Sequence, residues 1–338
     1  MTGTTTVAEL RADGISRPRL VPGAYIGRFR IVAGVAAGPA TSVYFAHAEG
    51  SDRGIALKAL DGPRARRPGR LDRFRREIRL LAACRDPGIV PLLDAEEDGE
   101  TPFYVMPWIS GPTLDQEARR GRMEPRRAAG IALGIARALE SIHRLGVVHR
   151  DVKPSNVVLS GRDRDRAWPI LIDFGIADRM EEIRTGPPEG ILGTIPYLSP
   201  EQIRAPWEVD GRSDLYALGS TLYELLTGRR PLQGHSRESS TFRILAGQVG
   251  RDCRSLRDAP AEIRAICGRL LVGDADRRYP HAADVVADLE RVVGGELPVP
   301  GRGPDAVTAR RALASRLLPA IAGAAAGAAL SWLAYSLF

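Results

Sequence analysis

The sequence predicts an α+β protein of two lobes, a small strand-rich lobe followed by a larger helix-rich lobe. Short apolar runs broken by Gly, Asp and Pro occupy roughly the first third of the chain, which is typical of hairpin strands. Longer runs with helical spacing follow. The chain has 338 residues, 44% of them apolar and 26% charged, and these values exclude a mostly disordered protein. Two such lobes leave a cleft between them, where ligands usually bind.

The small lobe is expected at about residues 24–109, after a flexible leader at 1–23. Its strands are predicted where apolar runs are bounded by turn residues, at 29–37, 41–48, 54–60, 89–97 and 102–109. One helix is predicted at 71–85, because its apolar residues fall on one face.

The large lobe is expected at about residues 110–293. Amphipathic or apolar periodicity predicts helices at 124–146, 213–228, 260–271 and 281–293. Gly146 ends the first of these. The second is apolar nearly all round, which predicts that it is buried.

A different segment follows the two lobes. Residues 294–316 form a linker rich in Pro, Gly and Arg, and residues 317–338 contain no charge. As a helix, the latter would span about 33 Å, enough for the core of a bilayer. Arginines precede it and aromatic residues lie at its far end, which favours a single-pass transmembrane helix in the cell membrane with the lobes in the cytoplasm. The alternative is an apolar helix docked on the large lobe.

Gly323 and Gly327 form a GxxxG pattern flanked by alanines. Such small residues allow two membrane helices to approach closely, which predicts a homodimer. The alternative is a membrane helix that is simply rich in small residues.

The chain is basic, with a net charge of +7. The charge is densest at 63–77, which is either a solvated surface or a site for acidic substrates, anionic lipid or a phosphorylated partner. Aromatic residues are only 6% and zinc-finger spacing is absent from the sequence, so we expect no nucleic-acid partner. The three cysteines, Cys84, Cys253 and Cys267, are sparse and odd in number, which favours a reducing compartment.

Lysine is rare in this chain. Of 48 basic residues, 46 are Arg and two are Lys, Lys58 and Lys153. A general drift from Lys to Arg would spare only positions where a planar guanidinium cannot replace a compact ammonium. These two lysines are therefore the first candidates for chemistry.

The strongest motif is HRDVKPSN at 149–156, followed by IDFG with Asp173. Asn156 and Asp173 offer the oxygen ligands that Mg²⁺ prefers, and Asp151 could accept a proton from a hydroxyl. The alternative is a pair of surface turns, but the combination of the two motifs does not arise readily by chance.

With these motifs in order, about residues 28–293 resemble the eukaryotic-like (Hanks-type) serine/threonine protein kinases, particularly those of bacteria. The resemblance implies the two-lobed protein-kinase fold. It also implies transfer of the ATP γ-phosphoryl group to Ser or Thr hydroxyls of protein substrates, with Mg²⁺ or Mn²⁺ and with autophosphorylation. The Lys-Pro pair after Asp151 resembles the Ser/Thr branch.

By this resemblance, Asp151 is the catalytic base and Lys153 contacts the transferred phosphoryl group. Asn156 and Asp173 hold the metal ions. Lys58 matches the lysine that binds the α- and β-phosphates, and Glu77 is its partner. The alternative for Glu77 is a solvated pair with a neighbouring Arg.

The segment 193–202 resembles the end of the family's activation segment. Thr194 is expected to contact Asp151 and Lys153. Glu201 is expected to pair with Arg278, with Arg277 as the less favoured choice. Asp214 is expected to accept backbone N–H groups of the catalytic loop, or else to cap the following helix.

The adenine base is expected at the link between the lobes. There Met106 lies at the gatekeeper position, and the carbonyl of Pro107 and the N–H of Ile109 face the adenine edge. The resemblance places Val43 and Ala56 above the ring and Val158 below it.

The glycine-rich loop departs from the family pattern. Ala36, Gly38 and Thr41 stand where the family has three glycines, and Pro39 stiffens the tip. This erosion motivates the alternative of a pseudokinase scaffold that binds nucleotide weakly. The intact charged positions favour an enzyme, and the segment 193–202 disfavours a small-molecule kinase.

The segment from Asp173 to Glu201 is poor in hydroxyl groups. Thr185 is the predicted autophosphorylation site, because Thr194 and Ser199 are placed for structural roles. Arg150 is the residue against which a phosphothreonine would dock.

Overall fold

The computed structural model describes residues 19–161, 167–180, 183, 194–232, 236–253 and 256–294. Several predicted features lie outside these residues: the leader up to residue 18, Thr185, the linker from residue 295, and the apolar segment 317–338 with Gly323 and Gly327. Within the described part of the chain, no helix is both long and apolar enough to cross a membrane.

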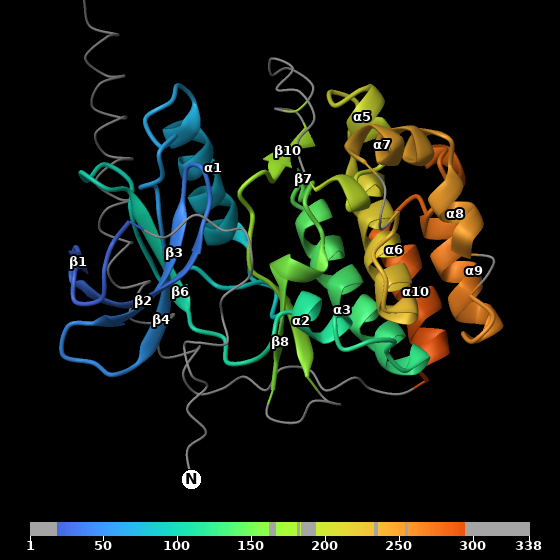
Figure 1. The fold of residues 1–338 in the computed structure, drawn as a ribbon, viewed down its shortest axis with the longest axis horizontal. Coiled ribbons are helices and arrows are strands. Elements are labelled where there is room, and N and C mark those ends of the chain that lie inside the picture. The colour runs from blue at the N-terminus through green and yellow to red at the C-terminus, as the bar shows by residue number, and fades with distance from the viewer. Residues whose placement is uncertain are drawn as a thin grey trace, which may run out of the picture.

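The small lobe is built on a six-stranded antiparallel sheet, seen at the left of Figure 1, with the order β1-β2-β3-β4-β6-β5. Its strands are β1 (Tyr25–Ile26), β2 (Phe29–Ala37), β3 (Ser42–Ala48), β4 (Gly54–Ala59), β5 (Asp94–Glu96) and β6 (Phe103–Pro107). One helix, α1 (Arg70–Ala83), packs beside the sheet. The predicted small lobe with a single helix is therefore present in this part of the chain.

Helix α1 follows the periodicity of its sequence. Phe74, Ile78 and Leu81 are buried together with Glu77, so one charged residue lies on the apolar face. Such a residue needs a partner of opposite charge. The helix ends at Cys84, whose backbone is extended.

The run 89–97 is less of a strand than its sequence predicts. Only Asp94–Glu96 forms β5. Ile89 instead forms an isolated bridge with Leu171, and the Val90 N–H donates to the Leu171 carbonyl at 2.9 Å. Pro91 has no N–H and cannot continue a ladder, so the first half of the run joins a strand of the large lobe.

The large lobe is mainly helical. Its helices are α2 (Leu114–Ala118), α3 (Pro125–His143), α5 (Pro200–Arg204), α6 (Gly211–Thr227), α7 (Arg237–Leu245), α8 (Gln248–Asp252), α9 (Ala261–Leu270) and α10 (Ala282–Val293). Its short strands are β7 (Val147–Val148), β8 (Val157–Ser160), β9 (Trp168–Leu171) and β10 (Asp178–Arg179). Helix α6 is buried on nearly all sides, as its composition predicts.

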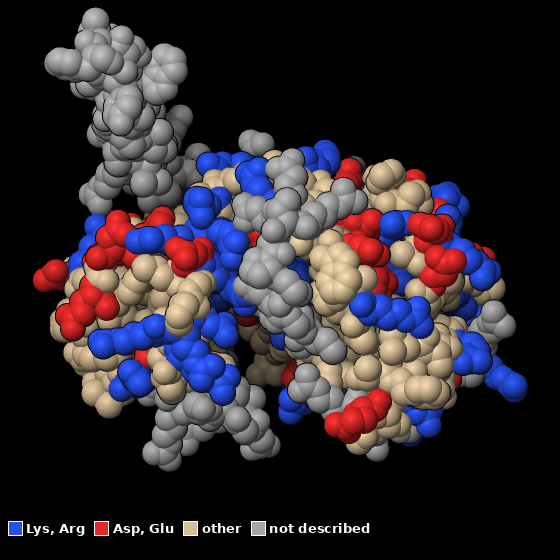
Figure 2. All heavy atoms as spheres, turned by 90° about the horizontal axis from the view of Figure 1, so that it is seen from above, with Lys and Arg blue, Asp and Glu red and all other residues tan. Residues whose placement is uncertain are grey.

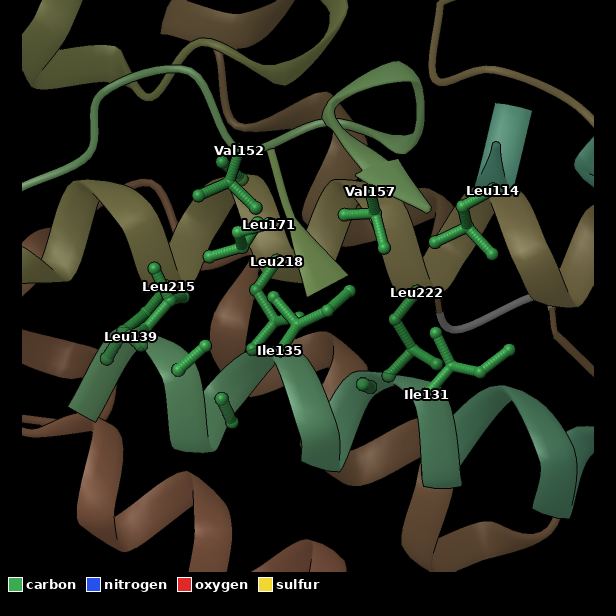
Figure 3. Close-up of a cluster of buried hydrophobic side chains, with 14 of the residues drawn as sticks. Leu114, Ile131, Ile135, Leu139, Val152, Val157, Leu171, Leu215, Leu218 and Leu222 are labelled. Atoms are coloured by element: carbon green, nitrogen blue, oxygen red, sulfur yellow. The ribbon is translucent and has the colours of Figure 1, made fainter. Parts of the chain in front are cut away.

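A hydrophobic layer lies under the strands that carry the motifs. Leu and Ile side chains of α3 and α6 meet Val157 of β8 and Leu171 of β9 (Figure 3). In the β8–β9 pair, Val157 is opposite Leu171. This register brings Asn156, just before β8, close to Asp173, just after β9.

The basic segment 63–77 divides into two parts. Arg64, Arg66 and Arg67 are exposed in the connector before α1. On the helix, Arg75 pairs with Asp98 at 2.5 Å, and Arg76 lies 3.9 Å from Asp178. The connector is therefore a solvated surface, whereas the helix arginines have acidic neighbours.

All three cysteines are buried and free. The sulfur atoms of Cys253 and Cys267 lie 3.1 Å apart, and burial raises the pKa of Cys84 to about 11. The raised pKa of Cys84 disfavours its thiolate, the form in which cysteine reacts.

Candidate active site

Lys58 links strand β4 to helix α1 and to the segment after β9. Its Nζ lies 2.8 Å from Glu77 Oε1 on α1 and 2.8 Å from Asp173 Oδ1 after β9. Lys58 is 6% exposed and Glu77 is 3% exposed. A buried ammonium between two carboxylates is stable only when these contacts are kept.

Lys58 and Asp173 hold each other ionised. Burial by itself would lower the pKa of Lys58, but the carboxylates of Asp173 and Glu77 outweigh it and raise the pKa well above its ordinary value. Burial would likewise raise the pKa of Asp173, but the charge and hydrogen bond of Lys58 lower it. Lys58 is therefore cationic and Asp173 anionic across the working range of pH.

The Asp-Phe-Gly segment is fixed by its own backbone. The Gly175 N–H donates to Asp173 Oδ1 at 3.0 Å, and the Phe174 N–H donates to Glu77 Oε1 at 3.2 Å. Phe174 is buried, with its ring 4.8 Å from the ring of His149. A Cβ on Gly175 would lie 3.4 Å from Lys58 Nζ, so the cluster has no spare room on that side.

The catalytic loop brings the second lysine to Asp151. Lys153 Nζ donates to Asp151 Oδ2 at 2.5 Å and to Thr194 Oγ1 at 2.8 Å. Thr194 in turn donates to Asp151 Oδ1 at 3.2 Å. Lys153 and Thr194, which are 41 positions apart in the chain, thus meet at the carboxylate of Asp151. A carboxylate is a group that can accept the proton of a hydroxyl.

Asn156 and Asp173 fit a divalent metal ion. The amide of Asn156 donates from Nδ2 to the Asp151 carbonyl at 2.9 Å and to Asp151 Oδ2 at 3.0 Å. This fixes the amide with Oδ1 as its remaining ligand atom. Asp173 binds Lys58 through Oδ1, and its side chain is 41% exposed. Mg²⁺ takes such oxygens together with substrate phosphates and water, so this small ligand set is sufficient.

Asp214 supports the catalytic loop from below. Its side chain is fully buried and accepts the N–H groups of His149 at 2.8 Å and Arg150 at 2.7 Å. Its Oδ2 also lies 2.8 Å from His143 Nε2. The cap of α6 is Asp210 instead. Asp214 therefore holds Arg150 in its left-handed backbone conformation, with φ of 67°, which is strained for a residue with a side chain.

Glu201 and the buried Arg278 form an ion pair within the large lobe. Arg278 Nη1 and Nη2 bind the two carboxylate oxygens at 2.6 and 2.8 Å, and Ser213 donates to the same carboxylate at 2.6 Å. Burial would raise the pKa of Glu201, but its bonds to Arg278 lower it. Arg277 is exposed. The pair joins α5 to the turn before α10.

The predicted adenine end lies where the sheet meets the large lobe. Met106 is buried opposite Ala56 in the β4–β6 pair, and Pro107 is opposite Ile55. Ile109 is partly buried against the core. Val158 of β8 is buried and Val43 of β3 is half-buried, so the predicted floor and roof come from different lobes.

The loop expected over the phosphates is the turn between β2 and β3. Ala36 pairs with Val43, and the Gly38 N–H donates to the Thr41 carbonyl at 2.7 Å. Gly38 is not among the glycines with positive φ, and a Cβ there would lie 3.4 Å from that carbonyl. The backbone at Gly38 is therefore not left-handed, and backbone conformation does not require glycine at this position.

Arg150 lies in a basic cluster with arginines of α1. Burial together with the charges of Arg70, Arg76 and Arg150 lowers the pKa of Arg73. The buried Nε of Arg150 has no hydrogen-bond partner among the described residues. The face that carries α1 and β10 displays many basic side chains (Figure 2).

Tyr104 and Gln202 are among the contributors to the site that were not predicted. Tyr104 is opposite Lys58 in β6 and donates its hydroxyl to Glu77 Oε1 at 2.9 Å. Gln202 donates its amide to the Arg150 carbonyl at 3.0 Å. Ser199 and Gln202 form a capping box, whose sequence pattern could have drawn attention to Gln202. Tyr104 could not be identified in this way, because an aromatic residue in a strand has no sequence pattern that indicates a role in a site.

The fold and the site together define a two-lobed protein with a lysine-centred cluster between its lobes and an Asp-Lys-Asn loop beside it. Comparison with known proteins specifies the family. A family profile described as "Protein kinase domain" matches residues 29–288. The chain therefore belongs to the protein kinase family.

Its relatives are bacterial serine/threonine-protein kinases. It is 35% identical to the kinase PknL of Mycobacterium tuberculosis, over 81% of this chain and 67% of PknL. It is 37% identical to the kinase PknB of Mycolicibacterium smegmatis, over 73% of this chain and 40% of PknB. A probable kinase of Streptomyces coelicolor, SCO3848, is 35% identical over 80% of this chain and 40% of its own length. The chain thus spans about two fifths of the length of the latter two relatives.

Proposed function

We propose that this protein is an ATP-dependent protein-serine/threonine kinase, held at a membrane by residues 317–338. The observation that carries the enzymatic part is the cluster in which Lys58 contacts both Glu77 and Asp173 at 2.8 Å. This contact closes the inner end of the cleft and leaves the second oxygen of Asp173 for a metal ion. An inactive scaffold has no need of such an arrangement.

The reaction is a transfer between two oxygens. Asp151 accepts the proton of a Ser or Thr hydroxyl, and the oxygen forms a bond to the γ-phosphorus of ATP. The bond from that phosphorus to the bridging oxygen breaks, and ADP leaves. Lys153 lies beside Asp151 and places a positive charge next to the group in transfer. A divalent metal at Asn156 and Asp173 supplies neutralisation of the phosphate charge.

The experiment compares wild-type protein with Asp151→Asn in an assay with radiolabelled ATP, Mg²⁺ or Mn²⁺ and a generic basic protein. Loss of the proton acceptor should lower kcat by about a thousandfold, whereas Asp52→Asn on an exposed turn should leave it unchanged. Equal incorporation by wild type and Asp151→Asn, or none by either, would favour the pseudokinase scaffold.

We further propose Thr185 as the activating autophosphorylation site. The basic cluster of Arg73, Arg76 and Arg150 supports this, because three guanidinium groups suit a phosphothreonine dianion. Asp178 lies in the same cluster, only a few residues before Thr185 in the chain. Mass spectrometry of the active enzyme should find phosphate on Thr185, and active enzyme with an unmodified Thr185 would contradict the assignment.

Membrane anchoring and dimerisation rest on the sequence of residues 317–338. Arginines before an uncharged segment favour a cytoplasmic kinase domain, and Gly323 and Gly327 favour helix pairing. Removal of residues 317–338 should move the protein from the alkali-washed membrane fraction to the supernatant. Cross-linking in detergent should yield dimers that Gly323→Leu weakens, and monomers alone in both proteins would exclude the pairing.

A further inference from the structure

The tip of the β2–β3 loop, residues 38–41, is fastened to the connector that runs from β4 to α1. The Gly62 N–H donates to the Ala40 carbonyl at 2.8 Å. The Arg64 N–H donates to the Pro39 carbonyl at 2.7 Å. Two consecutive carbonyl groups of the tip thus accept backbone bonds from outside the loop. We call this pair of bonds the tip clamp.

The connector side of the clamp is itself anchored to the sheet. The Leu60 N–H donates to the Pro102 carbonyl at 2.8 Å, and the hydroxyl of Tyr44, a fully buried residue of β3, donates to Asp61. The Ala65 N–H closes a turn by donating to the Gly62 carbonyl at 2.9 Å. The clamp therefore ties the loop to a fixed part of the small lobe.

Gly62 is the residue that permits this approach. A Cβ at this position would lie 2.6 Å from the carbonyl carbon of Ala40 and 2.8 Å from its Cα and N. These are backbone atoms that cannot rotate away, so any side chain at residue 62 must push the tip off the connector. Gly62 is buried, and its φ is not positive, so space and not backbone strain requires glycine here.

The tip of the β2–β3 loop has lost glycines but is held by additional contacts. Ala36 and Thr41 replace glycines, and Pro39 fixes one backbone angle. The Gly38–Thr41 bond closes the tip from within, and Ala40 and Ala65 are both partly buried against the same hydrophobic cluster. A tip with less backbone freedom and two external bonds is already ordered before a ligand binds.

We propose that Gly62 is a positioning residue for nucleotide binding, through which the tip clamp holds the phosphate-facing loop in its binding position. The proposal rests on the proposed function, in that the nucleotide is ATP. A loop that is ordered in advance loses less conformational entropy when the nucleotide binds. The family's glycines allow the loop to adapt to the nucleotide, whereas the clamp orders this loop before the nucleotide binds. The clamp also couples the loop to the connector that leads into α1.

The test compares Gly62→Ala with Gly268→Ala in the full chain. The control makes the same change in α9, where an added Cβ meets no atom within 4 Å. Gly62→Ala should raise the KM for ATP, and the Kd of a fluorescent ADP, by about tenfold, the scale of one or two lost backbone hydrogen bonds. The kcat and the KM for the protein substrate should stay within about twofold, because the clamp touches neither Asp151 nor the activation segment.

A KM and Kd for nucleotide within about twofold of the Gly268→Ala values would overturn the proposal. So would a loss confined to kcat. If the wild-type protein transfers no phosphoryl group, the kinase proposal fails by itself, and the Kd of fluorescent ADP still reports on the clamp.

A second measurement needs no variant and covers the case in which Gly62→Ala does not fold. Amide hydrogen exchange of the wild-type protein should show protection at Gly62 and Arg64, the two donors of the clamp. Adding ADP and Mg²⁺ should slow both amides by at least about threefold, because clamp and nucleotide stabilise each other reciprocally. Exchange at the rate of an unstructured peptide, or no response to nucleotide, would contradict the clamp.

Discussion

The two lysines of this arginine-rich chain lie in contrasting surroundings. The side chain of Lys58 is 7% exposed and contacts carboxylates from α1 and from the segment after β9, 19 and 115 residues away. The side chain of Lys153 is 19% exposed and contacts Asp151, two residues away, and Thr194. Lys58 is part of what joins the lobes, whereas Lys153 is more exposed and lies beside Asp151, the proposed proton acceptor. In the proposed function, the same ammonium has a structural and binding role at residue 58 and a chemical role at residue 153.

The largest expected effect comes from replacing each lysine with arginine, because the two variants should lose different kinetic properties. Lys58→Arg places a planar fork where a buried ammonium contacts Glu77 and Asp173 at 2.8 Å each, so it should displace Asp173 and lower kcat/KM for ATP by about 100-fold. Lys153 is more exposed than Lys58, and Lys153→Arg should lower kcat by about tenfold with an unchanged Kd for ADP. Steady-state kinetics and nucleotide binding check both. If Lys58→Arg and Lys153→Arg lose nucleotide affinity equally, the two lysines do not have different roles.

The next effect concerns the support of the catalytic loop. Asp214→Asn replaces one acceptor oxygen with a donor that faces a backbone N–H, and leaves a buried group unpaired. We expect a loss of about 2 kcal/mol in the free energy of unfolding and a tenfold to 100-fold lower kcat, with nucleotide affinity unchanged. Urea unfolding and kinetics measure these.

Asp210→Asn is the matched control, because Asn caps a helix as well as Asp does and Asp210 caps the same helix. A fall in nucleotide affinity in Asp214→Asn would show that this support also extends to the small lobe, and would break the comparison.

The smallest effect is a pH dependence of stability. Burial lowers the pKa of His149 from its ordinary value, so the folded protein keeps a neutral ring where the unfolded chain binds a proton. The associated stability is complete above about pH 6.5 and falls as the pH drops below it. We therefore expect the free energy of unfolding to fall as the pH drops from about 6.5 to about 5.5.

His149→Phe keeps a ring against Phe174 and should flatten this dependence. His281→Ser, on an exposed helix cap, should retain it. Urea unfolding at several pH values tests the assignment. An unchanged slope in His149→Phe would mean that other groups carry the acid sensitivity.

Much of the fold could be predicted from local patterns. The helices at 124–146 and 213–228 formed at Pro125–His143 and Gly211–Thr227, because their periodicity and end residues are local signals. The run 89–97 was the exception. Its apolar residues do not say which strand they pair with, and Ile89 found its partner in Leu171 of the other lobe.

From the sequence by itself, the order of the motifs and the charged residues of the candidate site could be predicted, because these are unusual residue types at fixed spacing. Only the tertiary structure decided that Tyr104 shares Glu77 with Lys58, that Gln202 holds the Arg150 carbonyl, and that Gly62 lies against Ala40. These contacts join ordinary residues, or backbone groups that every residue carries. Which of them meet depends on how distant segments pack, and no local pattern encodes that.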